Sequence, residues 1–229
     1  MERTKIGALV PCYNEAQRIS GVLSILLTTP GIDEVWCVDD GSTDGTAEVV
    51  RNRFPHVRLV SLPHNRGKAG AVLAGTEQMV DCDYVLLVDA DLQELNPQQL
   101  QAGVSKMTAQ NRIDMLIFFR TAEAWWAMAV RANDLFSGER IVRRSDLLDV
   151  LRSEEVEGYQ LEVAINSYMI ENKRNVERSP LYCRSVLTAE KVGWQAGMEK
   201  ESKMFRSIFD YLGLTGLVRQ MLWFPPLRF

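Results

Sequence analysis

The sequence contains no long apolar run and no paired cysteine motif. No window reaches the roughly 18 apolar residues that a membrane-spanning helix needs, and the opening residues M-E-R-T-K-I-G lack the apolar stretch of a secretory signal. The four cysteines are scattered along the chain, at Cys12, Cys37, Cys82 and Cys183. Without a C-x-x-C pair, neither a zinc site nor a disulfide framework is indicated. We therefore expect a cytoplasmic protein whose cysteines are small buried residues.

Several partner classes are also disfavoured by what is missing. A net charge of −4 and a pI near 5.4 argue against nucleic acid as the main partner. The sequence lacks both G-x-x-x-x-G-K-[ST] and G-x-G-x-x-G, which disfavours a P-loop nucleotidase and a dinucleotide-binding protein. No internal repeat, low-complexity segment or linker divides the 229 residues, so a second independent domain is not expected.

Apolar runs of strand length alternate with helical patterns in the first half of the chain. Strands are expected at residues 6–10, 35–38, 57–60, 84–88 and 115–119. Helices are expected at residues 16–27, 43–53, 68–80 and 97–107, and a further one at 159–171. Asn96 followed by Pro97 is a typical helix start. This alternation predicts an α/β fold, with a mostly parallel central sheet and helices on both faces.

Ligands of such sheets bind beyond the carboxyl ends of the strands, and four polar loops fall there. They read P-C-Y-N-E (11–15), D-D-G-S-T-D-G-T (39–46), P-H-N-R-G-K (63–68) and D-A-D-L-Q (89–93). Asp39 or Asp40 could accept hydrogen bonds from a nucleobase or a ribose. A turn into the next helix, capped by Ser42 or Thr43 and binding no ligand, is the alternative interpretation.

The third loop opens a helix with two cations. Helix N-termini attract anions, and the glycine permits close approach of the backbone. Asn65, Gly67 and Lys68 are therefore candidate phosphate contacts.

The fourth loop follows the apolar run Y-V-L-L-V. If the backbone stays extended, Asp89, Asp91 and Gln93 project to one side, because side chains alternate along a strand. Three hard oxygen donors suit a magnesium or manganese ion that shares its shell with waters and substrate phosphates. The alternative is an acidic, solvated turn at the end of a strand.

Taken in order, P-C-Y-N-E, V-D-D-G-S-T-D-G-T, N-R-G-K-A-G-A and V-D-A-D resemble the family 2 glycosyltransferases, which have a GT-A, Rossmann-like fold. The resemblance covers residues 6–107 and is greatest to the dolichyl-phosphate or polyprenyl-phosphate mannosyl- and glucosyltransferases. It implies one domain over residues 1–199, with a nucleotide-sugar-binding half at 1–110 and an acceptor half at 111–199.

The resemblance also assigns roles to residues of the matching motifs. It places Pro11, Tyr13 and Glu15 in a nucleobase pocket. It implies that the D-x-D aspartates, Asp89 and Asp91, bind the divalent ion that bridges the diphosphate. In the polyprenyl-phosphate branch, the glutamine of D-x-D-x-Q is a further metal ligand, which here is Gln93.

Two stretches of the second half resemble the same branch. Residues 134–140 read D-L-F-S-G-E-R against D-x-T-S-G-F-R, and residues 158–162 read G-Y-Q-L-E against G-F-x-x-E. Arg120 and Arg131 are the expected diphosphate contacts. The segment between Phe119 and Ser137 is shorter than is usual in the family.

The expected reaction is inverting transfer of a hexose from a nucleotide sugar of the GDP-mannose or UDP-glucose type, with Asp91 and Arg140 as catalytic residues. A hydroxyl acceptor needs a general base, which family 2 enzymes usually take from a Glu-Asp pair, and the sequence has no Glu-Asp dipeptide. A phosphate acceptor needs cations instead. Four arginines occur within fourteen positions, at Arg131, Arg140, Arg143 and Arg144. These two features favour a polyprenyl or dolichyl phosphate acceptor, although a solvated basic turn is the alternative for the arginines.

Three other functions stay open. A family 2 transferase acting on a soluble or glycan hydroxyl would use Asp134 or Glu139 as base. A nucleotidyltransferase fits less well, because P-C-Y-N-E replaces its usual glycine-rich loop. A non-catalytic nucleotide-sugar-binding protein would not need the intact D-x-D-x-Q.

The last thirty residues, 200–229, form an amphipathic pattern with interleaved cations and the ending L-W-F-P-P-L-R-F. Such a segment can lie on an anionic membrane, which would make the protein peripheral at the cytoplasmic face. Alternatively, it packs on the domain's own core or on a second copy of the chain in a homodimer.

Overall fold

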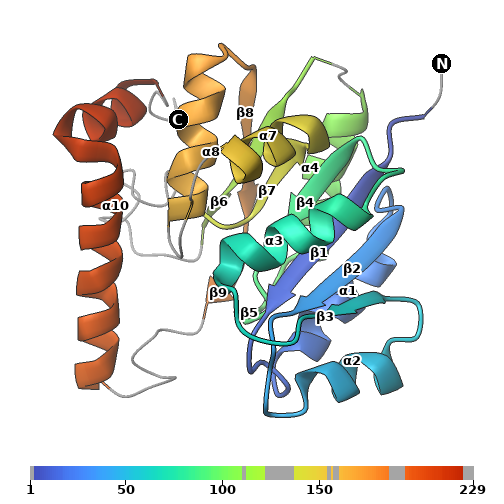
Figure 1. Cartoon of the computed structure of the whole chain (residues 1–229). Helices are drawn as coiled ribbons and strands as arrows, with labels where there is room; N and C mark the ends of the chain where they lie inside the picture. Colours follow the sequence, from blue (N-terminus) through green and yellow to red (C-terminus); the bar gives the residue numbers. More distant parts are fainter. Residues whose placement is uncertain are drawn as a thin grey trace.

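A seven-stranded sheet runs through the centre of the computed structural model (Figure 1). The described residues are 3–109, 112–121, 137–153, 156, 160–185 and 194–223. In chain order the strands of this sheet are β1 (Ile6–Cys12), β2 (Glu34–Asp39), β3 (Arg58–Ser61), β4 (Tyr84–Leu87), β6 (Met115–Arg120), β7 (Arg140–Arg143) and β8 (Val176–Leu181). Two short strands, β5 (Leu92–Gln93) and β9 (Arg184–Ser185), pair separately.

The sheet is mostly parallel, as the sequence predicts. Its strand order is β3-β2-β1-β4-β7-β6-β8. Strand β7 alone among these strands runs against its neighbours β4 and β6. Its first residue, Arg140, therefore lies opposite Leu87 at the end of β4, whereas Arg143 lies opposite Tyr84 at the beginning of β4.

Helices cover both faces of the sheet, as predicted. They are α1 (Ile19–Thr28), α2 (Thr46–Arg53), α3 (Gly67–Gln78), α4 (Pro97–Ala109), α7 (Arg144–Ser153), α8 (Leu161–Glu171) and α10 (Trp194–Trp223). Helices α1, α2 and α4 pack into one apolar cluster and α3, α7 and α8 into the other. Successive residues of β1 serve different clusters, since Ala8 faces the first and Leu9 the second.

One expected helix start is confirmed and one is wrong. Asn96 caps α4 by accepting a hydrogen bond from the backbone N–H of Gln99 at 3.0 Å. Helix α2 begins only at Thr46, with Gly45 in the N-cap position, so neither Ser42 nor Thr43 caps it. Ser42 instead accepts the backbone N–H of Asn14. Ser42 thus serves the neighbouring loop, whereas Asp44 accepts the N–H of Thr46, the first residue of α2, at 3.0 Å.

Helix α10 lies along α8 at one side of the molecule (Figure 1). Gln220 of α10 is buried and donates to the backbone carbonyl of Val163 at 2.8 Å. The domain boundary expected after residue 199 falls inside this helix. None of the helices in the described ranges has the length and apolar character needed to cross a bilayer.

Candidate active site

The loops after β1 and β2 are tied together at the carboxyl ends of these strands. Asn14 exchanges hydrogen bonds with the 42–43 stretch, from its N–H to Ser42 Oγ at 2.9 Å and from the Thr43 N–H to its side-chain oxygen at 2.9 Å. The N–H of Glu15 donates to Thr46 Oγ1 at 2.9 Å. The expected nucleobase residues Pro11, Tyr13 and Glu15 are thereby held beside the D-D-G-S-T-D-G-T loop.

Asp39 and Asp40 are both buried at the end of β2. Asp39 accepts the N–H of Ser42 at 3.2 Å, and Asp40 accepts the N–H of Arg66 at 2.7 Å. Between this pair and the next loop, Gly41 has a φ of 73°, and a Cβ there would lie 2.8 Å from the carbonyl carbon of His64. Only glycine allows the loops after β2 and β3 to approach this closely.

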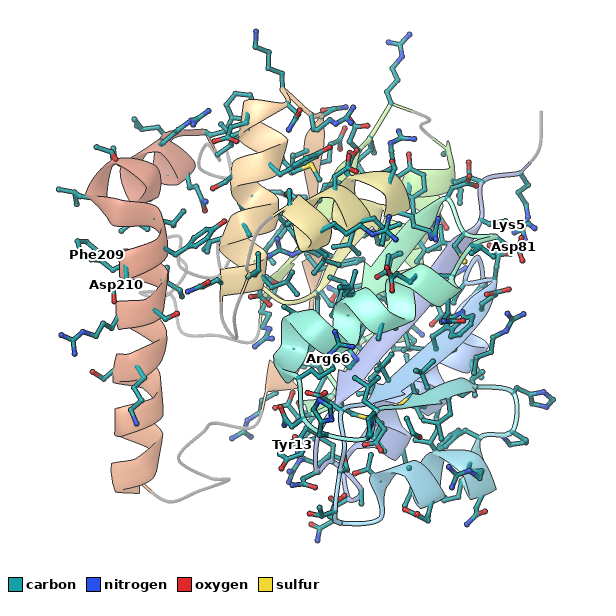
Figure 2. The ribbon with its side chains drawn as sticks, in the orientation of Figure 1. Lys5, Tyr13, Arg66, Asp81, Phe209 and Asp210 are labelled. Atoms are coloured by element: carbon teal, nitrogen blue, oxygen red, sulfur yellow. The ribbon has the colours of Figure 1, made fainter. Side chains whose placement is uncertain are left out.

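Tyr13 and Arg66 lie at the same end of the sheet, whereas Lys5 and Asp81 lie at the far end (Figure 2). Tyr13 is exposed and available for contact with a planar ligand. The turn that opens α3 is closed by Asn65, whose side-chain oxygen accepts the N–H of Gly67 at 2.9 Å. The structure thus brings three of the four predicted loops to one edge of the sheet.

Lys68 connects this edge to the fourth loop. Its ammonium nitrogen is 2.7 Å from Asp89 Oδ1 and 2.7 Å from Glu162 Oε1. Burial alone would lower the pKa of Lys68, but the two carboxylates outweigh it, so the pKa lies above its usual range. Lys68 is therefore charged throughout the physiological range.

Arg120 approaches the other oxygen of Asp89 at 3.8 Å. It also grips Glu139 through Nε and NH2, at 3.0 and 2.9 Å. Burial would lower the pKa of this guanidinium, but Glu139 and Asp89 raise it above its usual value. Gly138 passes so close that a Cβ there would lie 2.7 Å from Asp89 Oδ2 and 2.9 Å from Lys68 Nζ. The Asp89 carboxylate thus lies between two cations, under a glycine backbone.

The expectation of an extended backbone through Asp89, Asp91 and Gln93 is wrong. Strand β4 ends at Leu87, residues 90 and 91 form a turn, and β5 begins at Leu92. The alternation of side chains survives, however, because Ala90 and Leu92 are buried while the three polar residues between and beside them reach solvent.

This donor set fits a divalent ion that brings some of its own ligands. Within the described ranges, no group of three or more His, Cys, Asp or Glu residues could hold a metal. Asp89, Asp91 and the amide of Gln93 would leave coordination positions for water and phosphate, as magnesium and manganese prefer. The ammonium of Lys68 at Asp89 marks a position where a cation is favoured.

Arg140 is fully buried, which contradicts its expected role as an acceptor-phosphate contact. Its NH1 donates to the carbonyl of Glu162 and to Asn166 Oδ1, each at 3.1 Å, and the rest of the guanidinium bonds to the carbonyl of Ser137. Burial lowers the pKa of this guanidinium. Arg140 therefore positions the first turn of α8.

The predicted arginine cluster does not form among the described residues. Arg143 pairs with Asp114 at 3.0 Å, and Arg144 donates to the carbonyl of Thr76 at 3.0 Å. Both lie toward the beginning of β4, because β7 is antiparallel to it. Arg131, like the candidate base Asp134, lies outside the described residues.

Two glutamates of the site differ from the expectation. Glu139 is buried and paired with Arg120, so the expectation that it could act as a general base for a hydroxyl acceptor is wrong. Glu162 reaches Lys68, a contact that sequence reasoning missed. The only signal for it was the similarity of residues 158–162 to G-F-x-x-E.

This sheet order, with polar loops gathered at the carboxyl ends of its parallel strands, defines an α/β protein of the GT-A type. More than half of the chain, residues 8–152, matches the family described as Glycosyl transferase family 2. The chain belongs to this family, as the four loop motifs indicate.

Two curated relatives and one solved structure illustrate the similarity. The chain is 29% identical over 178 residues to glycosyltransferase AglJ of Haloferax volcanii, covering 69% of this chain and 56% of AglJ. It is 33% identical over 120 residues to a dolichyl-phosphate beta-glucosyltransferase of Trichomonas vaginalis, covering 45% of this chain and 35% of that protein. The chain thus spans about a third to a half of these two relatives.

The fold is similar to that of glucosyl-3-phosphoglycerate synthase from Mycobacterium tuberculosis, crystallised with Mn²⁺, uridine diphosphate and glucosyl-3-phosphoglycerate. The TM-score is 0.69 at 19% identity, over 95% of this chain and 80% of that one. At this identity the similarity concerns the fold.

Proposed function

We propose that the chain transfers a hexose from a nucleotide sugar to a polyprenyl phosphate, with inversion at the anomeric carbon and with a bound magnesium or manganese ion. The observation that carries this proposal is the placement of Asp89 between Lys68 and Arg120, at the edge of the sheet that also holds Asp39 and Asp40. A carboxylate for the ion and two cations for phosphate are what a leaving nucleoside diphosphate requires.

The donor would lie along this edge. Asp39 or Asp40 would accept hydrogen bonds from the base and ribose, beside Pro11, Tyr13 and Glu15. Lys68 and Arg120 would donate to the diphosphate and stabilise the charge that develops there as the bond to the sugar breaks. Asp89, Asp91 and Gln93 would hold the divalent ion, which acts as a Lewis acid on the diphosphate when bound.

The acceptor part of the proposal rests on three observations. A phosphate oxygen is already an anion, so it can form the bond to the anomeric carbon without a general base. The sequence has no Glu-Asp dipeptide, and Glu139 is occupied by Arg120. One relative is named a dolichyl-phosphate beta-glucosyltransferase. The dispersal of Arg140, Arg143 and Arg144 means that an arginine cluster does not support the phosphate acceptor.

The test is transfer of labelled hexose by the full chain with Mn²⁺. UDP-glucose and GDP-mannose are each offered with polyprenyl phosphate in vesicles and, separately, with 3-phosphoglycerate in solution. We expect a labelled product that extracts into organic solvent and releases hexose in mild acid. A water-soluble product formed only with 3-phosphoglycerate would instead establish the hydroxyl-acceptor alternative. Binding of donor without transfer or hydrolysis would support the non-catalytic alternative.

A lipid acceptor requires that the chain meet a membrane surface, and α10 is the segment we propose for this contact. Leu214, Val218 and Leu222 are exposed and spaced four residues apart, so they share one face of the helix, and Trp223 follows them. Gln220 is buried against α8 on the opposite side. A homodimer formed through the same apolar face is the competing proposal.

A further inference from the structure

We propose that Lys68 balances the charge of Asp89 when no metal is bound, and so acts as a built-in counter-ion at the metal site. When a divalent ion displaces Lys68 from Asp89, Glu162 retains the lysine. This inference rests on the proposed function, because it assumes that Asp89 receives a divalent ion together with a nucleoside diphosphate.

The ammonium of Lys68 is shared evenly between two carboxylates of unequal exposure. It is 2.7 Å from an oxygen of each. The Asp89 side chain is 28% exposed and that of Glu162 is 11% exposed, so an ion arriving from solvent reaches Asp89 more readily. Among the described residues, Lys68 forms the ion pair with the Glu162 carboxylate, and a buried carboxylate is destabilised when its ion pair is broken. Lys68 therefore gives up Asp89 rather than Glu162.

The position of Glu162 is fixed independently of Lys68. Its backbone carbonyl accepts a hydrogen bond from the fully buried Arg140 at 3.1 Å. Asn166, one turn further along α8, accepts from the same guanidinium. Gly138 covers the other side of the ammonium, since even a Cβ at this position would lie 2.9 Å from Nζ. Lys68 can therefore turn away from Asp89 while it keeps its contact with the Glu162 carboxylate.

This arrangement predicts opposite effects on two ligands. Without nucleotide, Lys68 competes with a divalent ion for Asp89 and lowers the affinity for the ion. With nucleotide present, the ion binds Asp89 and displaces the ammonium of Lys68. The N–H groups that Lys68 no longer donates to Asp89 then become available to the diphosphate. The competition would favour joint binding of ion and nucleotide over binding of the ion alone.

The test measures Mn²⁺ binding by electron paramagnetic resonance without nucleotide, and binding of UDP and GDP by calorimetry with saturating Mn²⁺. Lys68→Met should tighten Mn²⁺ binding about tenfold and weaken UDP or GDP binding about tenfold, the size of a coupling within one ion-pair network. Lys106→Met is the matched control, because Lys106 forms its ion pair with Glu177 and has no contact with Asp89 or Glu162 among those described. It should change neither affinity.

Glu162→Gln tests the second half of the inference and keeps the shape of the side chain. It leaves Asp89 as the remaining carboxylate at Lys68, so displacement by Mn²⁺ becomes harder and the affinity for Mn²⁺ falls about fivefold. In a Lys68→Met background the same substitution should have a smaller effect, because there is no ammonium left to hold. If Glu162→Gln changes the affinity for Mn²⁺ equally in both backgrounds, Glu162 acts by its charge alone, and the proposal that it retains Lys68 is wrong.

The outcomes separate the inference from the proposed function. If the wild-type chain binds Mn²⁺ and UDP or GDP while Lys68→Met leaves Mn²⁺ binding unchanged or weaker, the counter-ion role is wrong and the proposed function stands. If the wild-type chain binds neither Mn²⁺ nor either nucleotide, both are wrong. Thermal unfolding in chelator checks that each variant is folded, and added Mn²⁺ should raise the melting temperature more in Lys68→Met than in wild type.

Discussion

The guanidinium of Arg140 donates to the backbone carbonyl of Glu162 at 3.1 Å, so a fully buried strand residue supports the helix turn that presents a carboxylate to Lys68. Removal of this guanidinium would take a buried charged donor away from the carbonyl of Ser137 and from the side-chain oxygen of Asn166. The main role of Arg140, although it lies next to the site, is therefore to stabilise the fold.

Arg140→Met should lower the free energy of unfolding by about 3 kcal/mol, because buried acceptors lose a charged donor. Denaturant unfolding measures the change. Arg143→Met is the control, since Arg143 is part-exposed at its pair with Asp114 and should contribute about 1 kcal/mol or less. An Arg140 variant of normal stability that lost only the acceptor would restore the role expected from the sequence.

Asp91→Ala should reduce hexose transfer and Mn²⁺-dependent nucleotide binding at least about a hundredfold, as expected when charge stabilisation at the leaving group is lost. The fold should be unaffected, because Asp91 lies in a turn with part of its surface exposed. Transfer assays and thermal unfolding provide the two readouts. Wild-type activity in excess chelator, or in this variant, would eliminate the metal proposal.

The buried thiol of Cys82 should make stability depend on alkaline pH. Burial, with a smaller contribution from Glu34, raises its pKa to about 12. Above the ordinary thiol pKa, near 9, the unfolded chain loses this proton while the folded chain keeps it until about pH 12, so stability present below pH 9 is lost as the pH rises.

Cys82→Ala isolates this effect from other groups that titrate in the same range. The stability difference between wild type and variant should shrink by up to about 1.4 kcal/mol per pH unit above pH 9. Urea unfolding under reducing conditions, at several pH values from 8 to about 10.5, measures it. A difference that stayed constant with pH would mean that the folded thiol ionises normally.

The apolar face of α10 should bind anionic vesicles at low salt. Changing Leu214, Val218 and Leu222 together to Ser should abolish sedimentation with the vesicles, because apolar burial and attraction to anionic lipid both contribute to such binding. This triple variant is preferable to a truncation, since Gln220 is buried against α8.

Val80→Ser is the control for the vesicle experiment, because Val80 is exposed in the turn after α3 and should not affect binding. A wild-type chain that stays in the supernatant would rule out the membrane contact. If the chain is also dimeric and the triple variant is monomeric, the apolar face belongs to a subunit interface.

The sequence predicts five of the seven strands of the central sheet, because each of these five leaves a local apolar run, whereas β7 (R-I-V-R) and β8 (V-E-R-S-P-L) are missed because charged residues interrupt them. All five expected strands and the five helices named with them occur, with boundaries shifted by a few residues. The four polar loops could be assigned to one edge of the sheet, because the carboxyl ends of parallel strands lie at the same edge. In the D-x-D-x-Q stretch, buried side chains alternate with side chains that reach solvent, although a turn rather than a continuous strand produces this alternation.

The arginine cluster and the Lys68–Glu162 pair show where such reasoning stops. Arg140 and Arg143 are close in sequence, yet β7 carries them to opposite ends of β4, and nothing local announces the direction of that strand. Lys68 and Glu162 are 94 positions apart and meet only because α3 and α8 share one face of the sheet. Long-range charge pairing of this kind leaves no periodicity in the chain.

The cross-linked loops after β1 and β2 have a consequence for selectivity. Hydrogen bonds from Asn14, Glu15 and Ala16 to the 42–46 loop set the shape of this edge before any ligand arrives. The conformational entropy of these loops is therefore lost when the protein folds, and it is not lost again when a ligand binds. Discrimination between uridine and guanosine nucleotides should therefore reflect direct contacts on a rigid template, with similar association rates and different residence times.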